Sequence, residues 1–225
     1  IGTNTGFESD RSLPMDAKRI ADARLRGMKV VVVDPRFTHA AAKADEWVPI
    51  RPATDCAFVL GLVNLLLNKY AIYDAPFLQQ HTNAPYLIGP DGYYVVDPGT
   101  KKPLIWDTTD QCARPFDAFS DEETASKAAL GGQYKVNGVP CQPAFQLLKE
   151  RVREYTPERV EEIATVPAAT VRRVAREFGE NAQIGSTIEI EGQRWPLRCS
   201  LVAYYRGTQG HVHSTLTTQA LYTLQ

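Results

Sequence analysis

Residues 30–33 are four consecutive valines, a β-branched run without polar alternation. Such a run is typical of a strand buried on both faces of a parallel sheet, and we predict that it pairs in parallel with a neighbour. Asp34 and Pro35 end the run. A carboxylate at the carboxyl end of a parallel strand lies where open α/β sheets bind ligands. The pattern also fits a structural strand whose Asp caps the next turn, and the strand alone leaves both readings open.

The segments around this strand alternate between helical and extended patterns. An apolar side with Gly27 as a stop predicts a helix over residues 15–27. A short helix at 38–45 and a short strand at 46–50 follow the valines. Residues 56–68 are apolar nearly all round and predict a buried helix, with Thr54 or Asp55 as its N-cap. This order predicts the α/β class, with a Rossmann-like parallel sheet and flanking helices.

The second half of the chain changes character twice. Residues 83–142 contain many Gly and Pro turns between short aromatic strand patterns, which predicts a β-rich insertion. Helices resume after it, including one that opens at Val166 and ends at Gly179. Strands are expected at residues 184–190 and 197–205, and a last helix begins near His213 or Ser214. We therefore predict one Rossmann-like domain over residues 1–205 that carries the insertion.

Composition excludes several classes of function. The chain has 225 residues, 44% hydrophobic and 23% charged, with a net charge of −1, so no basic field is available for nucleic acid. The four cysteines are far apart, which gives no support for a zinc or iron–sulfur site. No apolar run is long enough to insert into a membrane. Because the chain opens without Met and closes within a helical pattern, we expect an internal fragment of a longer polypeptide.

Polar residues suited to a nucleotide fall at the predicted strand-to-helix junctions. Carboxylates there can accept from ribose hydroxyls or from the edge of a purine, and Arg and loop amides can bind a pyrophosphate. These candidates are Asn4, Glu8, Asp34, Arg36, Arg51, Thr54 and Asp55. No glycine-rich dinucleotide fingerprint or phosphate loop is present. Ordinary caps and turns remain the alternative, which spacing alone does not exclude.

A second candidate segment is residues 206–211, a loop rich in Gly, Gln and His. His211 and His213 are two positions apart, so they share no helix face and are a poor metal pair. Hydrogen bonding to a ligand suits this loop better. His39 and His81 are expected at the surface or at caps, and the acidic run at 121–123 is expected to be a solvated turn or helix start.

Several motifs in the same order resemble the molybdopterin oxidoreductases of the dimethyl sulfoxide reductase family. Gly2-Thr3-Asn4 followed by Glu8-Ser9 is similar to the family's Gly-x-Asn-x-x-Glu-Ser loop. Residues 27–36 resemble its Gly-x-Lys-Val-Val-Val-Val-Asp-Pro-Arg, residues 44–47 its Ala-Asp-x-Trp, and residues 51–55 its Arg-Pro-Gly-Thr-Asp. Two helix starts, at 155–158 and 166–168, and the loop at 206–211 also match.

The resemblance implies a bis-(molybdopterin guanine dinucleotide) cofactor with molybdenum or tungsten. Asn4, Glu8, Asp34, Arg36 and Asp55 would contact a guanosine diphosphate arm. Thr208, Gln209 and His211 would approach a pterin or the metal-side cavity, and Gln209 and His211 are the catalytic candidates. The cofactor-binding residues that the resemblance implies are Gly2, Asn4, Glu8, Asp34, Pro35, Arg36, Arg51, Thr54, Asp55, Arg206, Gly207, Thr208, Gln209 and His211. Residues 206–225 would begin the next cofactor-contacting segment.

Two departures from the family pattern have structural consequences. One extra residue precedes Glu8, and Ala53 replaces the usual Gly, so we expect a turn at Ala53 without a positive φ. The metal ligand and any iron–sulfur cysteines would lie upstream of Ile1, so this chain is not expected to be active alone. The resemblance implies two-electron redox or oxygen-atom transfer on a small-molecule substrate, and its implied partner is an iron–sulfur electron-transfer subunit. A non-catalytic nucleotide-binding module and a degenerate structural module are the alternatives, and neither substrate nor compartment is indicated.

Overall fold

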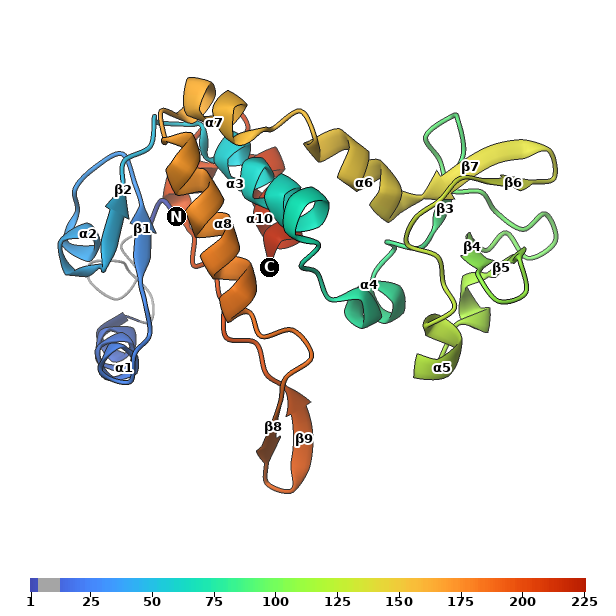
Figure 1. Cartoon of the computed structure of the whole chain (residues 1–225), viewed down its shortest axis with the longest axis horizontal. Coiled ribbons are helices and arrows are strands. Elements are labelled where there is room, and N and C mark those ends of the chain that lie inside the picture. The colour runs from blue at the N-terminus through green and yellow to red at the C-terminus, as the bar shows by residue number, and fades with distance from the viewer. Residues whose placement is uncertain (4–12) are drawn as a thin grey trace. The chain divides into compact units, whose positions relative to one another are not determined.

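The computed structural model of the chain describes residues 1–3 and 13–225, and the chain divides into two compact units (Figure 1). The first unit is Ile1–Ile72 with Glu154–Gln225, and the second is Tyr73–Arg153. The predicted insertion, residues 83–142, lies within the second unit. Residues 206–225 belong to the first unit. The boundary predicted at residue 205 stays a prediction.

The first unit contains the predicted parallel strand pair. Helix α1 (Leu13–Leu25) is followed by Gly27, whose φ is +99°. Strand β1 (Val31–Val33) then pairs in parallel with β2 (Glu46–Val48), and Val33 is opposite Val48. The crossover between them carries the short helix α2 (His39–Lys43), capped by the Thr38 side chain. Parallel pairing of the valine strand is therefore confirmed.

The wide Rossmann-like sheet is not present in the described residues. There, β1 and β2 are the only parallel strands, and the remaining sheets are antiparallel. Only Val33 of β1 is buried, whereas Val31 and Val32 are partly exposed. A run of valines identifies a strand but does not specify how many neighbours that strand has, which is why the pattern led to a larger sheet. The chain nonetheless mixes helices and strands, consistent with the α/β class.

Of the last two predicted strands, the one at residues 184–190 is present in shorter form and the one at residues 197–205 is absent. Strand β8 (Thr187–Ile190) pairs with β9 (Gln193–Pro196) in an exposed antiparallel hairpin, and residues 197–205 form no strand. Glu191 and Gly192 both have positive φ, at +53° and +77°, as a two-residue hairpin turn requires. The alternation of isoleucine with polar residues in β8 is the pattern of a hairpin rather than of a buried central strand.

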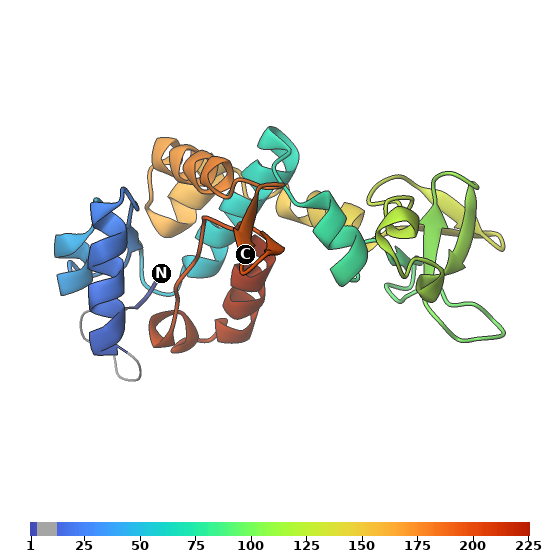
Figure 2. The same cartoon turned by 90° about the horizontal axis from the view of Figure 1, so that it is seen from below.

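The core of the first unit is the helix predicted at residues 56–68. Helix α3 (Asp55–Asn64) continues as a π-helical segment, η1 (Leu65–Tyr70), with Phe58 and Val59 fully buried. Helices α7 (Pro157–Ala164), α8 (Ala168–Asn181) and α10 (Ser214–Leu224) pack around it (Figures 1 and 2). The remaining short helix, α9 (Arg206–Gln209), leads into α10.

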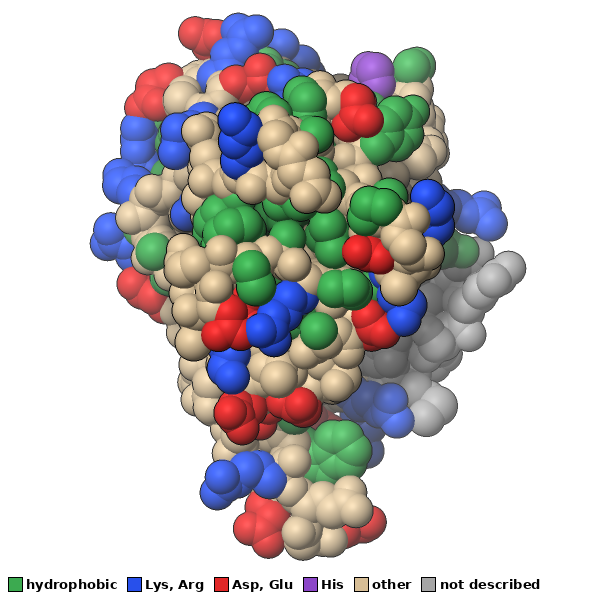
Figure 3. Space-filling view, turned by 90° about the vertical axis from the view of Figure 1, so that its right-hand side faces the viewer, with side chains coloured by type: hydrophobic (Ala, Val, Ile, Leu, Met, Phe, Trp, Pro, Cys, Tyr) green, Lys and Arg blue, Asp and Glu red, His purple; other side chains and the backbone are tan. Residues whose placement is uncertain are grey.

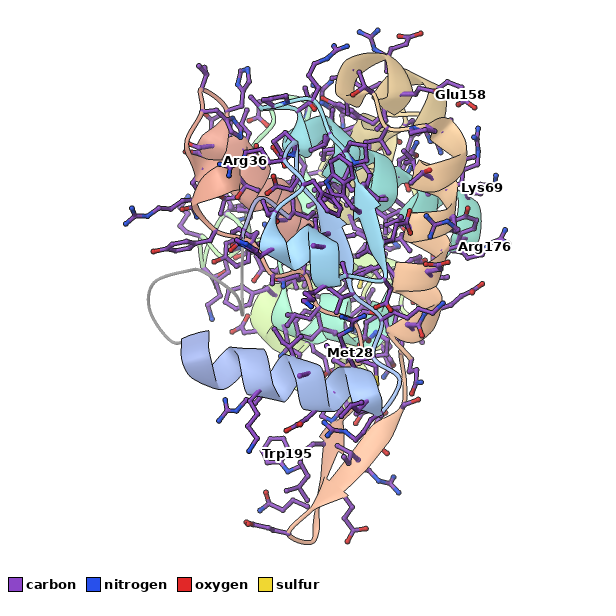
Figure 4. All side chains as sticks on the ribbon, turned by 90° about the vertical axis from the view of Figure 1, so that its left-hand side faces the viewer. Met28, Arg36, Lys69, Glu158, Arg176 and Trp195 are labelled. Atoms are coloured by element: carbon purple, nitrogen blue, oxygen red, sulfur yellow. The ribbon has the colours of Figure 1, made fainter. Side chains whose placement is uncertain are left out.

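Helix α8 continues past Gly179, contrary to the predicted end there. A Cβ atom at Gly179 would lie 2.6 Å from the Leu66 Cδ2 atom and 3.1 Å from Ile72 Cδ1. Glycine is therefore used at this position for close packing of α8 on η1 rather than to stop the helix. On the same helix the Arg176 guanidinium lies 5.2 Å from the centre of the Tyr70 ring, which is a cation–π contact. Arg176 is labelled in Figure 4.

The second unit is antiparallel and rich in short strands. Strands β3 (Leu87–Ile88), β7 (Val139–Pro143) and β6 (Tyr134–Val136) form one sheet, and β4 (Leu104–Asp107) with β5 (Cys112–Pro115) forms a hairpin. The β-rich character predicted for this region agrees with that arrangement. Helices complete the unit: α4 (Ala75–His81), the 3-10 turn η2 (Phe116–Ala118), α5 (Glu122–Ala125) and α6 (Ala144–Val152).

Local signals in this unit have clear structural outcomes. The acidic run begins α5, where Asp121 and Thr124 form a reciprocal capping box. One of the short aromatic patterns of the predicted insertion, residues 93–96, forms only isolated bridges, from Tyr94 and Val96. Hydrophobic side chains gather on the face seen in Figure 3, and several large ones in this unit are exposed. Among the residues described, no single helix is long and apolar enough to span a membrane, although Asp55–Tyr70 taken together with Ala75–His81 has the length and composition of a broken span.

Candidate functional site

The first residues of the chain connect two segments that are remote in sequence. The Gly2 backbone N–H donates to the Val33 carbonyl at 3.1 Å, at the end of β1. The Gly207 N–H donates to the Gly2 carbonyl at 3.0 Å, and the Ile1 nitrogen donates to the Ala203 carbonyl at 2.7 Å. The end of β1 and the start of α9 are therefore held on either side of Gly2.

This junction requires glycine at two positions. A Cβ atom at Gly207 would lie 2.2 Å from the Gly2 carbonyl oxygen and 2.7 Å from its carbonyl carbon. Gly2 itself has a φ of +57°, and a Cβ there would lie 3.0 Å from backbone atoms of Gly207 and Thr208. Backbone-to-backbone contact of this kind leaves no room for a side chain.

Asp34 follows β1 and is tied into the turn that ends the strand. Its Oδ1 atom accepts from the Arg36 N–H at 2.8 Å, and its carbonyl accepts from the Trp47 Nε1–H at 2.9 Å. The Asp34 N–H donates to Val48 of β2 at 3.2 Å. Pro35 and Arg36 are exposed beyond the strand, and Arg36 is labelled in Figure 4. The Asp34 side chain therefore makes the turn contact expected of a capping residue, and it does so through one carboxylate oxygen, Oδ1.

The turn before α3 differs from the prediction in one respect. Ala53 has a φ of +63°, so the expectation that this turn would avoid a positive φ is wrong. Thr54 occupies the N-cap position, but its hydroxyl donates to the Arg51 carbonyl at 2.7 Å instead of capping the helix. Arg51 is directed to the end of α7, with its N–H donating to Ala164 O at 2.9 Å and its Nη1 to Glu162 O at 3.5 Å. Arg51 and Thr54 thus support the loop.

Asp55 is the first residue of α3 and one of the few buried carboxylates among the described residues. It is 5% exposed. Burial raises the pKa of the Asp55 carboxyl above its ordinary value; the charge of Asp34 acts in the same direction, and His211 opposes both. A carboxylate held in this environment is stabilised by any donor that reaches it.

His211 lies against Asp55. Its Nε2 atom is 3.9 Å from Asp55 Oδ2, and its side chain is 12% exposed. Both ring nitrogens are buried and have no hydrogen-bond partner in the described part of the chain. An unsatisfied buried polar group costs about 1–3 kcal/mol, so the imidazole is positioned for a partner that the described residues do not supply.

The first turns of α3 and α10 adjoin at this point. The side chain of Cys56, in α3, lies beside that of Thr217, in α10, and Thr217 is fully buried. Neither helix has a side-chain cap: Thr54 and His213 occupy the N-cap positions without capping bonds. Two helix N-termini without side-chain caps therefore lie beside Asp55 and His211, although the first N–H of α10, that of Ser214, donates to the His211 carbonyl at 3.1 Å. The partial positive charge of such helix ends suits an anion.

The segment predicted as a glycine-rich loop is the one-turn helix α9. The Thr208 side chain is fully buried, and its hydroxyl donates to the Tyr205 carbonyl at 2.8 Å. Arg206 and Gln209 are exposed, and the Arg206 guanidinium lies 5.7 Å from the centre of the Tyr205 ring. Thr208 is thus committed to local structure, whereas the Gln209 amide faces the exterior of the described chain.

The structure brings together some of the predicted residues and separates others. Gly2, Asp34, Asp55, Gly207 and His211 converge. Arg51 bonds to the end of α7, Thr54 bonds to the Arg51 carbonyl, and Asn4 and Glu8 lie outside the described residues. Sequence reasoning did not pair Asp55 with His211, because nothing in their spacing shows that α3 and α10 pack with adjoining first turns. Within the described ranges, no group of three His, Cys, Asp or Glu residues could hold a metal ion.

The chain is similar to proteins of one family. The family model described as molybdopterin oxidoreductase matches residues 1–129. A sulfite dehydrogenase subunit from Allochromatium vinosum is 37% identical over 180 residues, covering 73% of this chain and 18% of that protein. A putative dimethyl sulfoxide reductase catalytic subunit from Halobacterium salinarum is 33% identical, covering 72% of this chain and 20% of that protein. The alpha subunit of perchlorate reductase from Dechloromonas aromatica is 30% identical, covering 72% of this chain and 22% of that protein.

A solved structure has the same fold. Acetylene hydratase from Pelobacter acetylenicus aligns with 93% of this chain and 18% of its own, with a TM-score of 0.51 and 22% sequence identity. At that identity the likeness concerns the fold alone. The chain spans about a fifth of the length of the curated relatives named above.

Proposed function

The chain belongs to the molybdopterin oxidoreductase family, and from that premise we propose that the residues around Gly2, Asp34, Asp55 and His211 bind one guanosine diphosphate arm of a bis-(molybdopterin guanine dinucleotide) cofactor. The observation that carries the proposal is the buried pair of Asp55 and His211, with both imidazole nitrogens unpartnered in the described residues. Buried groups of this kind are satisfied by a ligand with polar edges.

The donors and acceptors of the junction suit the parts of a guanosine diphosphate. The Asp55 carboxylate can accept from the imino and amino groups of guanine, and the second carboxylate oxygen of Asp34 can accept from a ribose hydroxyl. The uncapped starts of α3 and α10 offer backbone N–H groups to the pyrophosphate. In this proposal Asn4, Glu8 and Arg36 also contact the guanosine diphosphate arm, and Pro35, Arg51 and Thr54 shape the loops around it. Arg206 and Gln209 extend toward the pterin, and Thr208 supports their turn from within.

In this proposal the chain forms part of a catalytic subunit that carries out two-electron redox or oxygen-atom transfer. When bound, the cofactor supplies the molybdenum or tungsten that undergoes the redox change. The residues of this chain hold the nucleotide, exclude water from it through the helices α3 and α10, and fix its orientation. A small-molecule substrate, an iron–sulfur cluster elsewhere in the protein and an iron–sulfur partner subunit belong to the same proposal. The named relatives differ in their substrates, so no substrate is chosen.

The test is the cofactor content of the whole protein that carries this chain. Replacement of Asp55 by alanine should lower both guanine nucleotide and molybdenum per polypeptide, because the guanine donors lose a buried acceptor worth about 1–3 kcal/mol. The matched control is Asp74→Ala, which removes a true N-cap bond to Phe77 N at 3.1 Å in α4. That control should lower the melting temperature and leave the cofactor in place. Full cofactor content in Asp55→Ala would refute the proposal.

A further inference from the structure

We propose that His211 is a positioning residue for Asp55, and that both side chains act at the nucleotide end of the cofactor rather than at its metal. This inference rests on the proposed function and deepens it. The family resemblance implies that His211 approaches a pterin or the metal-side cavity and that Asp55 contacts the guanosine arm. The geometry instead places the two side chains in one cluster.

The distance between the two groups carries the argument. Asp55 Oδ2 and His211 Nε2 are 3.9 Å apart. In a molybdopterin guanine dinucleotide, the guanine and the metal-binding pterin are separated by a ribose and a pyrophosphate. Two side chains in contact with each other cannot serve opposite ends of such a ligand. If Asp55 binds guanine, His211 is at the guanine as well.

The charged groups around Asp55 and His211 suggest a role for the His211 imidazole in positioning Asp55. Asp34 follows the end of β1 and Asp55 begins α3, and the charge of Asp34 is near enough to raise the pKa of Asp55. The His211 imidazole is a hydrogen-bond-donating side chain that faces Asp55. An imidazole N–H directed at Asp55 Oδ2 offsets the repulsion between the carboxylates and leaves Asp55 Oδ1 directed at the ligand.

The separation between Asp55 Oδ2 and His211 Nε2 is slightly longer than a hydrogen bond. At 3.9 Å the two atoms are within ion-pair range but beyond the usual N–H···O distance of about 2.7–3.2 Å. A shift of about 1 Å by either side chain closes the gap, and both ring nitrogens are free of competing partners in the described residues. Catalytic-site hydrogen bonds are often longer without ligand and tighten when it binds.

A double-mutant cycle in the whole protein tests the pairing. The variants are Asp55→Asn, His211→Ala and their combination, and the measured quantity is guanine nucleotide retained per polypeptide. We expect each single change to lower retention, His211→Ala on the order of tenfold as for other residues that orient a ligand-binding group. The combined variant should lose no more than the worse single one, because both changes remove the same interaction.

Two further variants separate positioning from a general structural role. His211→Gln keeps an N–H donor of similar reach and should restore most of the retention. His213→Ala removes the exposed imidazole two residues away, which makes no capping bond, and should change nothing. Losses that simply add in the combined variant would overturn the inference. So would a His211→Ala protein that keeps its guanine nucleotide and loses only turnover, since that result assigns His211 to the metal end.

The result is distinguishable from failure of the proposed function. If the wild-type protein holds no guanine nucleotide, the proposed function fails, and the same four proteins are then compared by their melting temperatures. Coupled changes in melting temperature would still support the Asp55–His211 pair as a positioning contact. Additive changes would overturn it.

Discussion

Gly207→Ala should break the junction that holds the candidate site together. The new Cβ would lie 2.2 Å from the Gly2 carbonyl oxygen and 2.7 Å from two further Gly2 backbone atoms, so backbone must move. Overpacking of this kind costs about 1–3 kcal/mol. Losing the bond from Gly207 N–H to the Gly2 carbonyl adds about 1 kcal/mol. The local opening free energy should fall by about 2–4 kcal/mol, or about 30- to 900-fold in the opening equilibrium.

Amide hydrogen exchange read by mass spectrometry on the whole protein measures this opening directly. Peptides that contain Gly2 and residues 205–208 should exchange faster by the stated factor, and peptides from the second unit should not change. Gly210→Ala is the control, because its Cβ would meet only the Arg206 carbonyl oxygen, at 3.3 Å. Unchanged exchange in Gly207→Ala would show that Gly2 and Gly207 are not in contact, and the reasoning about the site would fail with it.

Three further predictions concern single side chains. Ala53→Gly should stabilise the loop before α3 by about 0.5–1 kcal/mol, because relief of the left-handed φ, worth about 1–2 kcal/mol, exceeds the cost of the added freedom of the unfolded chain, about 0.4–1 kcal/mol. Slower hydrogen exchange of the loop amides would support this, and faster exchange would contradict it. The pKa of Asp45 is lowered by the hydrogen bonds that it accepts from the Val30 N–H and Arg24, so these bonds stabilise the fold above the ordinary pKa of 3.8 and lose that effect as pH falls. Hydrogen exchange of the Val30 amide should therefore speed up in acid, and Asp45→Asn should abolish this change. Because burial raises the pKa of Asp55, the contribution of this carboxyl to the stability of the fold is present at low pH and is lost as pH rises through the raised pKa. Asp55→Asn should therefore raise the melting temperature of cofactor-free protein at neutral pH, whereas a lowered melting temperature would indicate a capping role.

Local parts of the structure could be predicted because they depend on local signals. The parallel pairing of the valines follows from an unbroken β-branched run, and the start of α7 follows from Thr156 and Pro157, whose cap bond to Arg159 N is 3.2 Å. The acidic run at 121–123 likewise became a helix start. Each of these features is decided within a few residues of the chain.

The parts that could not be predicted depend on tertiary contacts. Gly179 has the pattern of a helix stop, but Leu66 and Ile72 pack against it and the helix continues. The positive φ of Ala53 has no signature in an alanine. The contact between Asp55 and His211 depends on α3 and α10 having adjoining first turns, which no spacing in the sequence shows.

The central claim is that four separate segments form one nucleotide site, and the most direct test is hydrogen exchange of the whole protein with and without its cofactor. The account predicts that residues 1–3, 33–36, 53–57 and 206–214 gain protection together when the cofactor is bound, while β4, β5 and α5 of the second unit do not change. Protection confined to other segments, or none in these four, would contradict it.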